Sequence, residues 1–229
     1  MIGAVLFDAL GTLVELEPPA PHLRRALVKR TDASVTVLEA EQAIAAEMVY
    51  YRAHLNEGRD ASSLEALRQC YAEVLRDALP ARARPADLDV VLEVLLDSLQ
   101  FRAFRDARPA LEALRNGGLR LIVVSNWDCS LPSALDRIGL APLLDGVVAS
   151  AVAGARKPSA AIFERALAAA GVGPARALHV GDSVAEDIEG ARGAGIEPVL
   201  LRRDGGPGPP GVTTIPSLSE LKRLLEPRQ

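Results

Sequence analysis

The sequence contains little cysteine, few aromatic residues and no long apolar run. Its only two cysteines, Cys70 and Cys129, lie far apart without the close spacing of a redox or metal pair, which favours a reducing compartment. No apolar stretch reaches the roughly 18 residues that a membrane-spanning helix needs. The N-terminus also lacks the basic region of a signal peptide. We therefore expect a cytoplasmic protein with no membrane partner.

Charge of one sign is not concentrated anywhere in the chain. The formal net charge is −4, and the 26 lysines and arginines are scattered, which argues against nucleic acid as the main partner. Hydrophobic residues make up 49% of the 229 residues, but aromatics only 3%, so a core of Ala, Leu and Val is expected. This length suits one large domain or a domain that carries an insertion.

The first thirteen residues organise the rest of the chain. Residues 3–7 form a short apolar run that ends at a glycine-containing turn, which predicts a strand buried on both faces. Asp8 follows this strand directly. In an open α/β sheet ligands bind beyond the carboxyl ends of the strands, and a carboxylate there needs a compensating partner. Asp8 is therefore either an ordinary turn residue or a functional acid.

Residues 22–99 carry apolar side chains at helical spacing and no strand signal. Breaks at residues 31–36, 58–63 and 80–85 divide this block into roughly four helices, which is typical of a small bundle. The preceding proline-rich residues 15–21 and the following residues 101–108 are expected to be connectors.

From residue 109 onward, helical and strand patterns alternate. The expected strands are 119–124, 146–150, 177–180 and 198–201, and the expected helices are 109–116, 131–138, 159–170, 185–194 and 218–225. Short connections between alternating elements predict a parallel, doubly wound sheet. We therefore predict an α/β core made of residues 1–16 and 101–229, with residues 17–100 inserted as a helical subdomain.

Polar residues follow several of these strands. Ser125 and Asn126 come after the second strand, Asp182 after the fourth, and Asp187 five residues later, while Lys157 lies in a loop after the third. Parallel strands bring such residues to one edge of the sheet, where acids could hold a divalent cation and a lysine could neutralise an anion. Each residue also has an ordinary interpretation as a turn former, surface lysine or first-turn acid. Their shared position favours a site.

Four segments resemble the motifs of the haloacid dehalogenase-like hydrolase superfamily. They read F-D-A-L-G-T-L, V-V-S-N-W-D, R-K-P-S-A-A-I-F and H-V-G-D-S-V-A-E-D-I-E-G-A, and they span the chain from its first strand to about Gly195. The helical insertion resembles the cap of the subclass that includes dehalogenases and phosphoglycolate-type phosphatases. The resemblance implies a hydrolase that acts on a small, anionic molecule.

The resemblance also implies roles for individual residues. Asp8 would be the nucleophile that forms an aspartyl ester or phosphate, and Thr12 would help to position the transferred group. Ser125 and Asn126 would hold its oxygens, and Lys157 would balance its charge. The implied Mg²⁺ ligands are Asp8, the backbone carbonyl of Leu10, and Asp182, with Asp187 in support. His179, just before the Gly-Asp of the fourth segment, could touch the site, but we expect it to be a core histidine with a hydrogen-bond partner.

Leu10 departs from the phosphatase pattern. The superfamily's phosphatases usually carry at this position an Asp that protonates the leaving alcohol, and leucine has no proton to give. Dehalogenases also lack this acid, because a halide leaves without a proton. However, three acids at one site would repel one another without a cation, so Asp8, Asp182 and Asp187 favour a metal-dependent phosphatase.

Two alternatives remain open from the sequence. One is a metal-independent dehalogenase of short 2-haloacids that uses the same nucleophile. The other is a binding or regulatory protein that keeps the fold and metal site but turns over poorly because Leu10 replaces the acid. The sequence leaves the substrate and the oligomeric state open.

Overall fold

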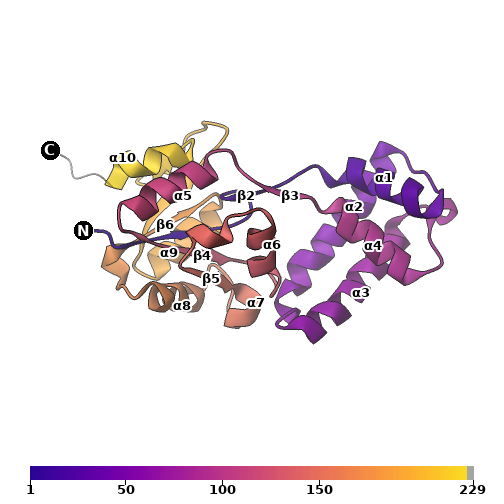
Figure 1. The fold of residues 1–229 in the computed structure, drawn as a ribbon, viewed down its shortest axis with the longest axis horizontal. Coiled ribbons are helices and arrows are strands. Elements are labelled where there is room, and N and C mark those ends of the chain that lie inside the picture. The colour runs from indigo at the N-terminus through magenta and orange to yellow at the C-terminus, as the bar shows by residue number, and fades with distance from the viewer. Residues whose placement is uncertain (226–229) are drawn as a thin grey trace. The chain divides into compact units, whose positions relative to one another are not determined.

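The computed structural model describes residues 1–225, which divide between two compact units (Figure 1). The first unit contains Met1–Glu15 and the chain from Arg102 onward. The second contains Leu16–Phe101. These boundaries differ by one residue from the division expected from the sequence. Among the described residues, no helix combines the length and apolar character needed to cross a bilayer.

The first unit is built on a six-stranded sheet whose neighbouring strands are all parallel. In spatial order the strands are β5 (Gly146–Ala149), β4 (Arg120–Ser125), β1 (Ala4–Phe7), β6 (Ala177–Gly181), β7 (Glu197–Leu201) and β8 (Thr213–Ile215). The chain starts at β1, builds outward through β4 and β5, and returns to the other side of β1 at β6. This reversal confirms the predicted doubly wound topology and places the strand order's switch point beside β1.

Strand β1 is fully buried because both faces of the sheet are covered. Its residues Ala4 and Leu6 pack in one core cluster with Ile162 and Phe163 of helix α8 (Ala160–Ala170). Helix α5 (Ala107–Asn116) contacts β4 from the opposite face (Figure 1). The remaining helices of this unit are α6 (Leu131–Arg137), α7 (Ser150–Ala153), α9 (Glu189–Gly193) and α10 (Leu221–Leu225). Two-sided burial explains why this strand reads as a continuous apolar run.

Three short strands and one helix differ from the sequence-based expectations. Strands β2 (Val14–Leu16) and β3 (Phe101–Ala103) pair with each other where connectors were expected, and β8 was not predicted. Each has three residues, too few for a periodic pattern to stand out. The expected helix 185–194 opens with a π-helical turn over Val184–Ile188, and only then continues as α9.

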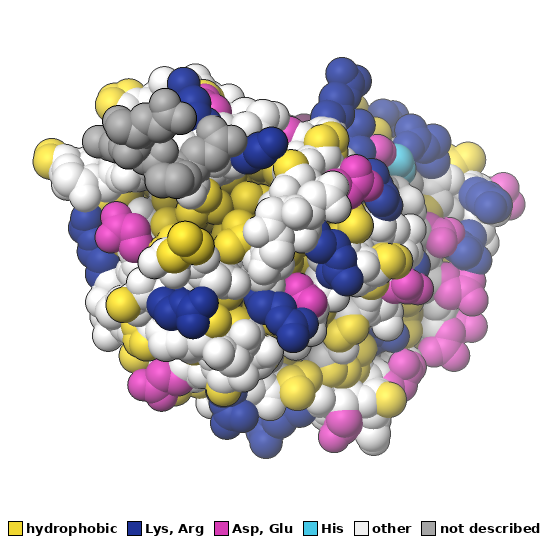
Figure 2. Space-filling model, turned by 60° about the vertical axis from the view of Figure 1, so that its left-hand side comes forward, with side chains coloured by type: hydrophobic (Ala, Val, Ile, Leu, Met, Phe, Trp, Pro, Cys, Tyr) yellow, Lys and Arg dark blue, Asp and Glu magenta, His cyan; other side chains and the backbone are white. Residues whose placement is uncertain are grey.

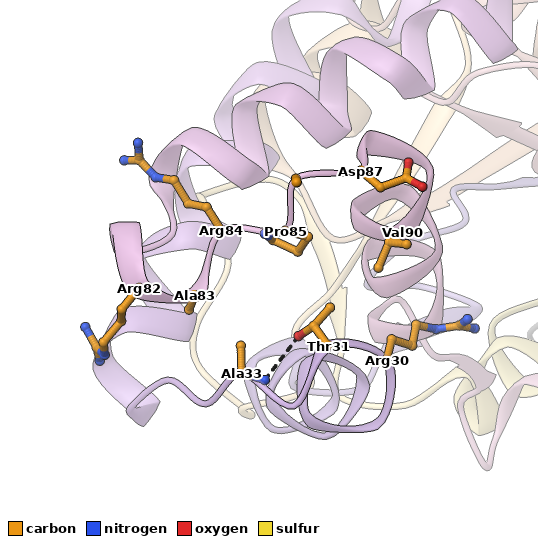
Figure 3. A pocket seen from close by; sticks show the side chains of 10 residues that line it. Arg30, Thr31, Ala33, Arg82, Ala83, Arg84, Pro85, Asp87 and Val90 are labelled. Atoms are coloured by element: carbon orange, nitrogen blue, oxygen red, sulfur yellow. Dashed lines mark hydrogen bonds between the residues drawn. The ribbon is translucent and has the colours of Figure 1, made fainter.

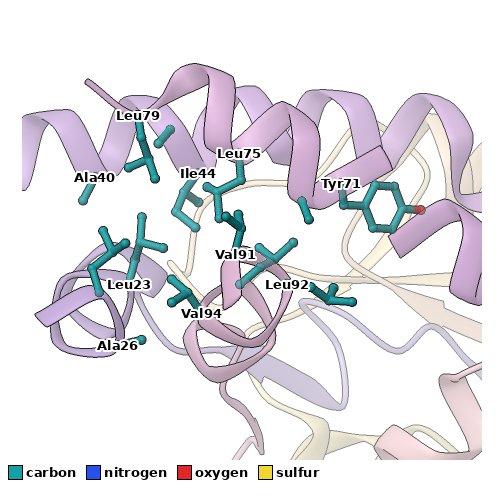
Figure 4. Packing of buried hydrophobic residues seen from close by; sticks show 14 of the residues in the cluster. Leu23, Ala26, Ala40, Ile44, Tyr71, Leu75, Leu79, Val91, Leu92 and Val94 are labelled. Atoms are coloured by element: carbon teal, nitrogen blue, oxygen red, sulfur yellow. The ribbon is translucent and has the colours of Figure 1, made fainter. Parts of the chain in front are cut away.

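The second unit is the predicted four-helix block. Its helices are α1 (Pro19–Thr31), α2 (Val37–His54), α3 (Ala61–Ala78) and α4 (Leu88–Ser98). Leu23, Ile44, Leu75 and Val91, one from each helix, meet in its hydrophobic core (Figure 4). The rarity of aromatics is reflected there, because the cluster consists mainly of Ala, Leu and Val. The unit therefore has a core of its own, as a subdomain requires.

Candidate active site

The residues expected at the sheet edge come together in the first unit. Asp8 follows β1, Ser125 is the last residue of β4, and Asp182 follows β6 directly. Because β4 and β6 are the two neighbours of β1, their carboxyl ends flank Asp8. Lys157 reaches the same place from the loop between α7 and α8, and its side chain is buried.

Lys157 is the centre of this group. Its Nζ donates to Oδ1 of Asp8 at 2.5 Å and to Oδ1 of Asp187 at 2.6 Å. Burial by itself lowers the pKa of Lys157, but attraction to Asp8 and Asp187 outweighs that effect and raises the pKa above its ordinary value. Lys157 is therefore a charged ammonium at neutral pH. Ser125 Oγ donates to the same Asp8 oxygen at 2.9 Å.

The carboxylate of Asp8 is buried and its pKa is raised. Desolvation is the largest cause, and the negative charge of Asp187 adds to it, while Lys157 and Ser125 act in the opposite direction. The carboxylate thus loses hydration but keeps one cationic and one hydroxyl donor. Such an environment suits a nucleophile, since a partly desolvated carboxylate is less masked by water.

Asp187 is held on both oxygens. Besides Lys157, its Oδ1 accepts from His179 Nε2 at 2.9 Å, and its Oδ2 accepts from the backbone N–H of Ser183 at 3.0 Å. Burial raises its pKa, but attraction to Lys157 and the bond from His179 outweigh burial, so the pKa lies well below its usual range. Asp187 is therefore ionised, with its oxygens already engaged by protein donors.

His179 combines the expected core position with a contact to the site. It is fully buried, as a core histidine would be, but its Nε2 contacts an acid of the site. Since the ionised Asp187 can only accept, Nε2 carries the proton. The ring also meets the edge of Phe163 in a T-shaped contact, with centroids 5.0 Å apart. Side chains alternate along β6, so His179 and Gly181 lie on the same face of the sheet. This alternation was the one sequence signal that could have placed His179 near the site.

Asp182 completes a cluster of three acids. One carboxylate oxygen from each of Asp8, Asp182 and Asp187 lies within 4.8 Å of the others. Asp182 presents part of its side chain to solvent, yet its pKa is raised to about 7. The causes are desolvation first, then repulsion by Asp8 and Asp187. In this cluster Lys157 pairs with Asp8 and Asp187 but not with Asp182.

Two glycines allow the acids to approach the backbone so closely. A Cβ on Gly11 would lie 2.2 Å from Asp182 Oδ2, and one on Gly181 would lie 2.1 Å from Asp187 Cγ. Gly11 also adopts φ +87°, in the left-handed region that favours glycine. These positions therefore require glycine for steric reasons, and at Gly11 also for backbone conformation.

Asn126 and Thr12 are placed differently from each other. The side-chain amide of Asn126 forms a reciprocal pair with the backbone of Lys157, donating to its carbonyl at 3.1 Å and accepting from its N–H at 2.8 Å. Asn126 thereby fixes the backbone of Lys157. Thr12 is fully buried, and its Oγ1 has no hydrogen-bond partner among the described residues. A buried hydroxyl without a partner is available to a ligand.

Leu10 is 37% exposed in the loop that follows Asp8, so its side chain is not part of a packed core. Arg203, which follows β7, contacts the same loop and donates hydrogen bonds to the carbonyls of Gly11 and Thr12. Sequence reasoning did not single out Arg203. Its neighbour Arg202 is also an arginine after the same strand, and nothing in the pattern separates the two.

The second unit carries a surface pocket of its own, lined in part by Arg30, Arg82 and Arg84 (Figure 3). Arg30 pairs with Asp97 and Arg82 with Glu39, and Arg84 donates to backbone carbonyls. The guanidinium groups in Figure 3 point away from the pocket. The cationic charge is thus compensated locally, and elsewhere charges of both signs are interspersed on the visible surface (Figure 2).

The chain is similar in sequence to several known proteins. The chain is 37% identical over 135 residues to haloacid dehalogenase-like hydrolase domain-containing protein 3 of Bos taurus, covering 55% of this chain and 53% of that protein. It thus spans about half the length of that relative. It is 30% identical over 202 residues to a phosphoglycolate phosphatase of Caulobacter vibrioides, covering 87% of this chain and 78% of that enzyme.

Solved structures share the whole fold. A 2-haloacid dehalogenase from Pseudomonas syringae pv. Tomato DC3000 superposes with a TM-score of 0.70 at 26% identity, covering 98% of each chain. The model of the family described as haloacid dehalogenase-like hydrolase matches residues 2–195, which include all four segments that meet at the sheet edge. The chain therefore belongs to the haloacid dehalogenase-like hydrolases.

Proposed function

We propose that this protein is a Mg²⁺-dependent phosphatase of small phosphate esters that acts through an aspartyl phosphate on Asp8. The observation that carries the proposal is the charge of the site. The carboxylates of Asp8, Asp182 and Asp187 lie within 4.8 Å of one another, and Lys157 ion-pairs with only two of them. Desolvation and then repulsion by Asp8 and Asp187 raise the pKa of Asp182 to about 7, and a divalent cation would relieve the repulsion.

The residues present fit Mg²⁺. This ion prefers oxygen ligands and is usually held by one or two carboxylates together with water and substrate phosphate. Asp8 and Asp182 would hold it, with the backbone carbonyl of Leu10. Asp187 has its oxygens on Lys157, His179 and Ser183, so it would support the site indirectly. When bound, Mg²⁺ would neutralise negative charge on the transferring phosphoryl group.

The chain's own residues supply the remaining chemistry. A carboxylate oxygen of Asp8 attacks phosphorus, the ester P–O bond breaks, and the alcohol departs with a proton taken from water. Lys157 holds Asp8 in place and balances the anionic phosphoryl group, and Ser125 orients the carboxylate. Thr12 Oγ1 is available to a phosphoryl oxygen. Water then hydrolyses the aspartyl phosphate and releases inorganic phosphate.

Asn126 has a positioning role in this proposal. Both ends of its side-chain amide are bonded to the backbone of Lys157. The amide thus fixes the backbone of the lysine that contacts Asp8. The sequence also predicts that Asn126 contacts phosphoryl oxygens directly, and this stays a prediction.

Substrates of this kind would be small and anionic. The similarity to a protein named phosphoglycolate phosphatase supports this class. The helical unit, residues Leu16–Phe101, would act as the cap that selects among such esters. The two cysteines, Cys70 and Cys129, lie far apart in the sequence and form no disulfide, which supports a cytoplasmic location.

A panel of phosphate esters, assayed with Mg²⁺ and with a chelator, tests the proposal. We expect hydrolysis that requires Mg²⁺ and that disappears in Asp8→Asn, because an amide is a far weaker nucleophile. Asp145→Asn is the matched control: Asp145 precedes β5 and therefore lies at the opposite edge of the sheet, so activity should persist. Wild-type turnover by Asp8→Asn would refute the assignment.

A metal-independent 2-haloacid dehalogenase is the second candidate, and Leu10 is the observation that favours it. Halide departure needs no proton, so a leucine at this position would cost such an enzyme nothing. The likeness to a solved 2-haloacid dehalogenase is in keeping with this option. Release of chloride from 2-chloropropionate in the presence of chelator, with no Mg²⁺-dependent phosphatase activity, would establish it instead.

A further inference from the structure

We propose that Arg203 is a positioning residue that fixes the loop carrying the nucleophile and, through Gly11, the acid Asp182. The inference rests on the proposed function for its catalytic consequence. The structural part of the inference, that Arg203 fixes the loop, concerns only the first unit. It can be tested without an activity assay and without metal.

Arg203 reaches the nucleophile loop from a distant part of the chain. It follows β7, yet its Nη2 donates to the carbonyl of Thr12 at 2.7 Å and its Nε to the carbonyl of Gly11 at 3.3 Å. The loop also holds itself together, since the N–H groups of Leu13 and Val14 both donate to the carbonyl of Ala9 at 2.8 Å. Arg203 is thus an external support of a tight turn that begins one residue after Asp8.

Asp106 holds Arg203 in this orientation. Both its oxygens accept from Arg203 Nη1, at 3.1 and 3.0 Å. Burial raises the pKa of Asp106, but the bonds from Arg203, Ser217 and the Leu218 N–H outweigh it, so the pKa is below its ordinary value. The pair is partly shielded, with 26% and 15% of the two side chains exposed. A shielded pair with several hydrogen bonds keeps its geometry better than a surface pair.

Phe104 supports Arg203 from one side. The guanidinium carbon lies 3.7 Å from the centre of the Phe104 ring, and the Phe104 N–H donates to the carbonyl of Leu13 at 3.0 Å. Three successive carbonyls of the loop, those of Gly11, Thr12 and Leu13, are therefore held by Arg203 and the residue on which it stacks. A planar guanidinium meets all these partners at once, which an ammonium does not.

Gly11 passes this constraint to the proposed metal site. Its Cα lies so close to the Asp182 carboxylate that an added Cβ would be 2.2 Å from Oδ2. A shift of the Gly11 backbone therefore either strikes Asp182 or releases it. Asp8 sits at the other end of the same turn. Because small displacements of reacting groups can lower a rate by about 10²-fold, a support at this point has a catalytic consequence.

Arg203→Met and Arg202→Met are the matched pair of variants. Arg202 is the neighbouring residue, with the same charge, but it pairs with Asp204. The first measurement is hydrogen exchange, followed by mass spectrometry, in the peptide covering residues 8–14 of the full-length, metal-free protein. We expect exchange there to be faster by about tenfold or more in Arg203→Met and unchanged in Arg202→Met.

The second measurement is Mg²⁺ affinity by calorimetry, together with kcat and KM. We expect Arg203→Met to weaken Mg²⁺ binding and to lower kcat by roughly 10–100-fold with little change in KM, since it supports ligands without touching substrate. Arg203→Lys, which keeps the charge beside Asp106, should show a smaller defect in the same quantities. If Arg203→Met does not fold, Arg203→Lys takes its place in both measurements.

A merely structural role would give a different result. Arg203→Met, or Arg203→Lys in its place, would then lower the melting temperature, while exchange in residues 8–14 and Mg²⁺ affinity matched Arg202→Met; this would overturn the inference. If wild-type protein neither binds Mg²⁺ nor hydrolyses esters, the proposed function fails. In that case the exchange comparison still decides whether Arg203 fixes the loop.

Discussion

At the residue scale, the departure at Leu10 determines what the site can do. The position lies two residues after Asp8, and its side chain is 37% exposed, so a polar replacement would not have to be buried. In the proposed mechanism Asp8 is the nucleophile and Lys157 is a charged partner, but Leu10 offers no proton to a leaving group. Esters whose alcohols leave as stable anions should therefore be its best substrates.

Leu10→Asp should raise activity toward alkyl phosphates. General acid catalysis is typically worth about 10²–10⁴ in rate, which sets the ceiling, and the gain should be smaller because the surroundings are not shaped for an acid. Aryl phosphates leave with little help and should respond far less. Leu10→Asn is the control, because asparagine matches the shape of aspartic acid but its amide cannot act as a general acid. Equal rates for the two variants on alkyl phosphates would show that the acid is not what this enzyme lacks.

Gly11→Ala should weaken Mg²⁺ binding through steric conflict with Asp182. The new Cβ would approach Asp182 Oδ2 to 2.2 Å, in addition to the cost of φ +87°. Gly118→Ala is the matched control, since Gly118 has φ +79° and nothing lies within 4 Å of its Cβ position. Both variants should lose about 1–3 kcal/mol of stability from the backbone, but only Gly11→Ala should lose Mg²⁺ affinity by calorimetry. Equal losses of Mg²⁺ affinity in the two variants would contradict a specific contact between residue 11 and Asp182.

At the element scale, helix α2 carries an acid on its buried face. Glu47 is 2% exposed and shares that face with Ala40, Ala43 and Ile44, and burial raises its pKa from 4.5 to about 7. In the folded state Glu47 therefore keeps its proton between about pH 4.5 and 7, whereas the unfolded chain releases it. Stability should fall as pH rises through this window, and level off above it.

Glu47→Gln should make that decline shallower, because glutamine stays neutral at every pH, while the raised pKa of Asp182 still contributes to the decline. At pH 8 the variant should be more stable than wild type by at most about 3 kcal/mol, since one pKa unit corresponds to about 1.4 kcal/mol. Urea unfolding at pH 5 and pH 8 measures the effect. Glu41→Gln, an exposed position on the same helix, should leave the pH dependence of wild type in place. A decline in stability as steep in Glu47→Gln as in wild type would refute the assignment.

At the scale of the whole molecule, the charge of the site links metal binding to stability. With Mg²⁺ at 100 times its Kd, the folded state gains about 2.7 kcal/mol, which should raise the melting temperature by several degrees. Asp182→Asn should abolish this shift. In metal-free buffer at pH 8 the variant should melt no lower than wild type, because one of three mutually repelling carboxylates is gone.

Asp204→Asn is the control for this measurement, because Asp204 is an exposed acid paired with Arg202. It should keep the full Mg²⁺ shift of wild type. A shift that survived in Asp182→Asn would mean that Mg²⁺ stabilises the protein from another place.

The amino-acid sequence by itself determined the parallel sheet, the helical insertion and the edge at which the polar residues meet. Apolar runs mark β1, β4 and β6, and apolar residues at helical spacing mark α3 and α4, because these signals are local and long enough to read. Parallel strands then place Asp8, Ser125 and Asp182 at one edge whatever the details of packing. Three-residue strands such as β8 carry too little pattern to be recognised.

Only the tertiary structure decided which groups compensate one another. Lys157 serves Asp8 and Asp187, and His179 points at Asp187, although no spacing rule assigns these partners. Arg203 meets Gly11 across 192 positions of sequence, while Arg202 beside it does not. A buried polar group takes the partner that packing brings within hydrogen-bond distance. That partner is set by the folded chain as a whole, so local pattern does not reveal it.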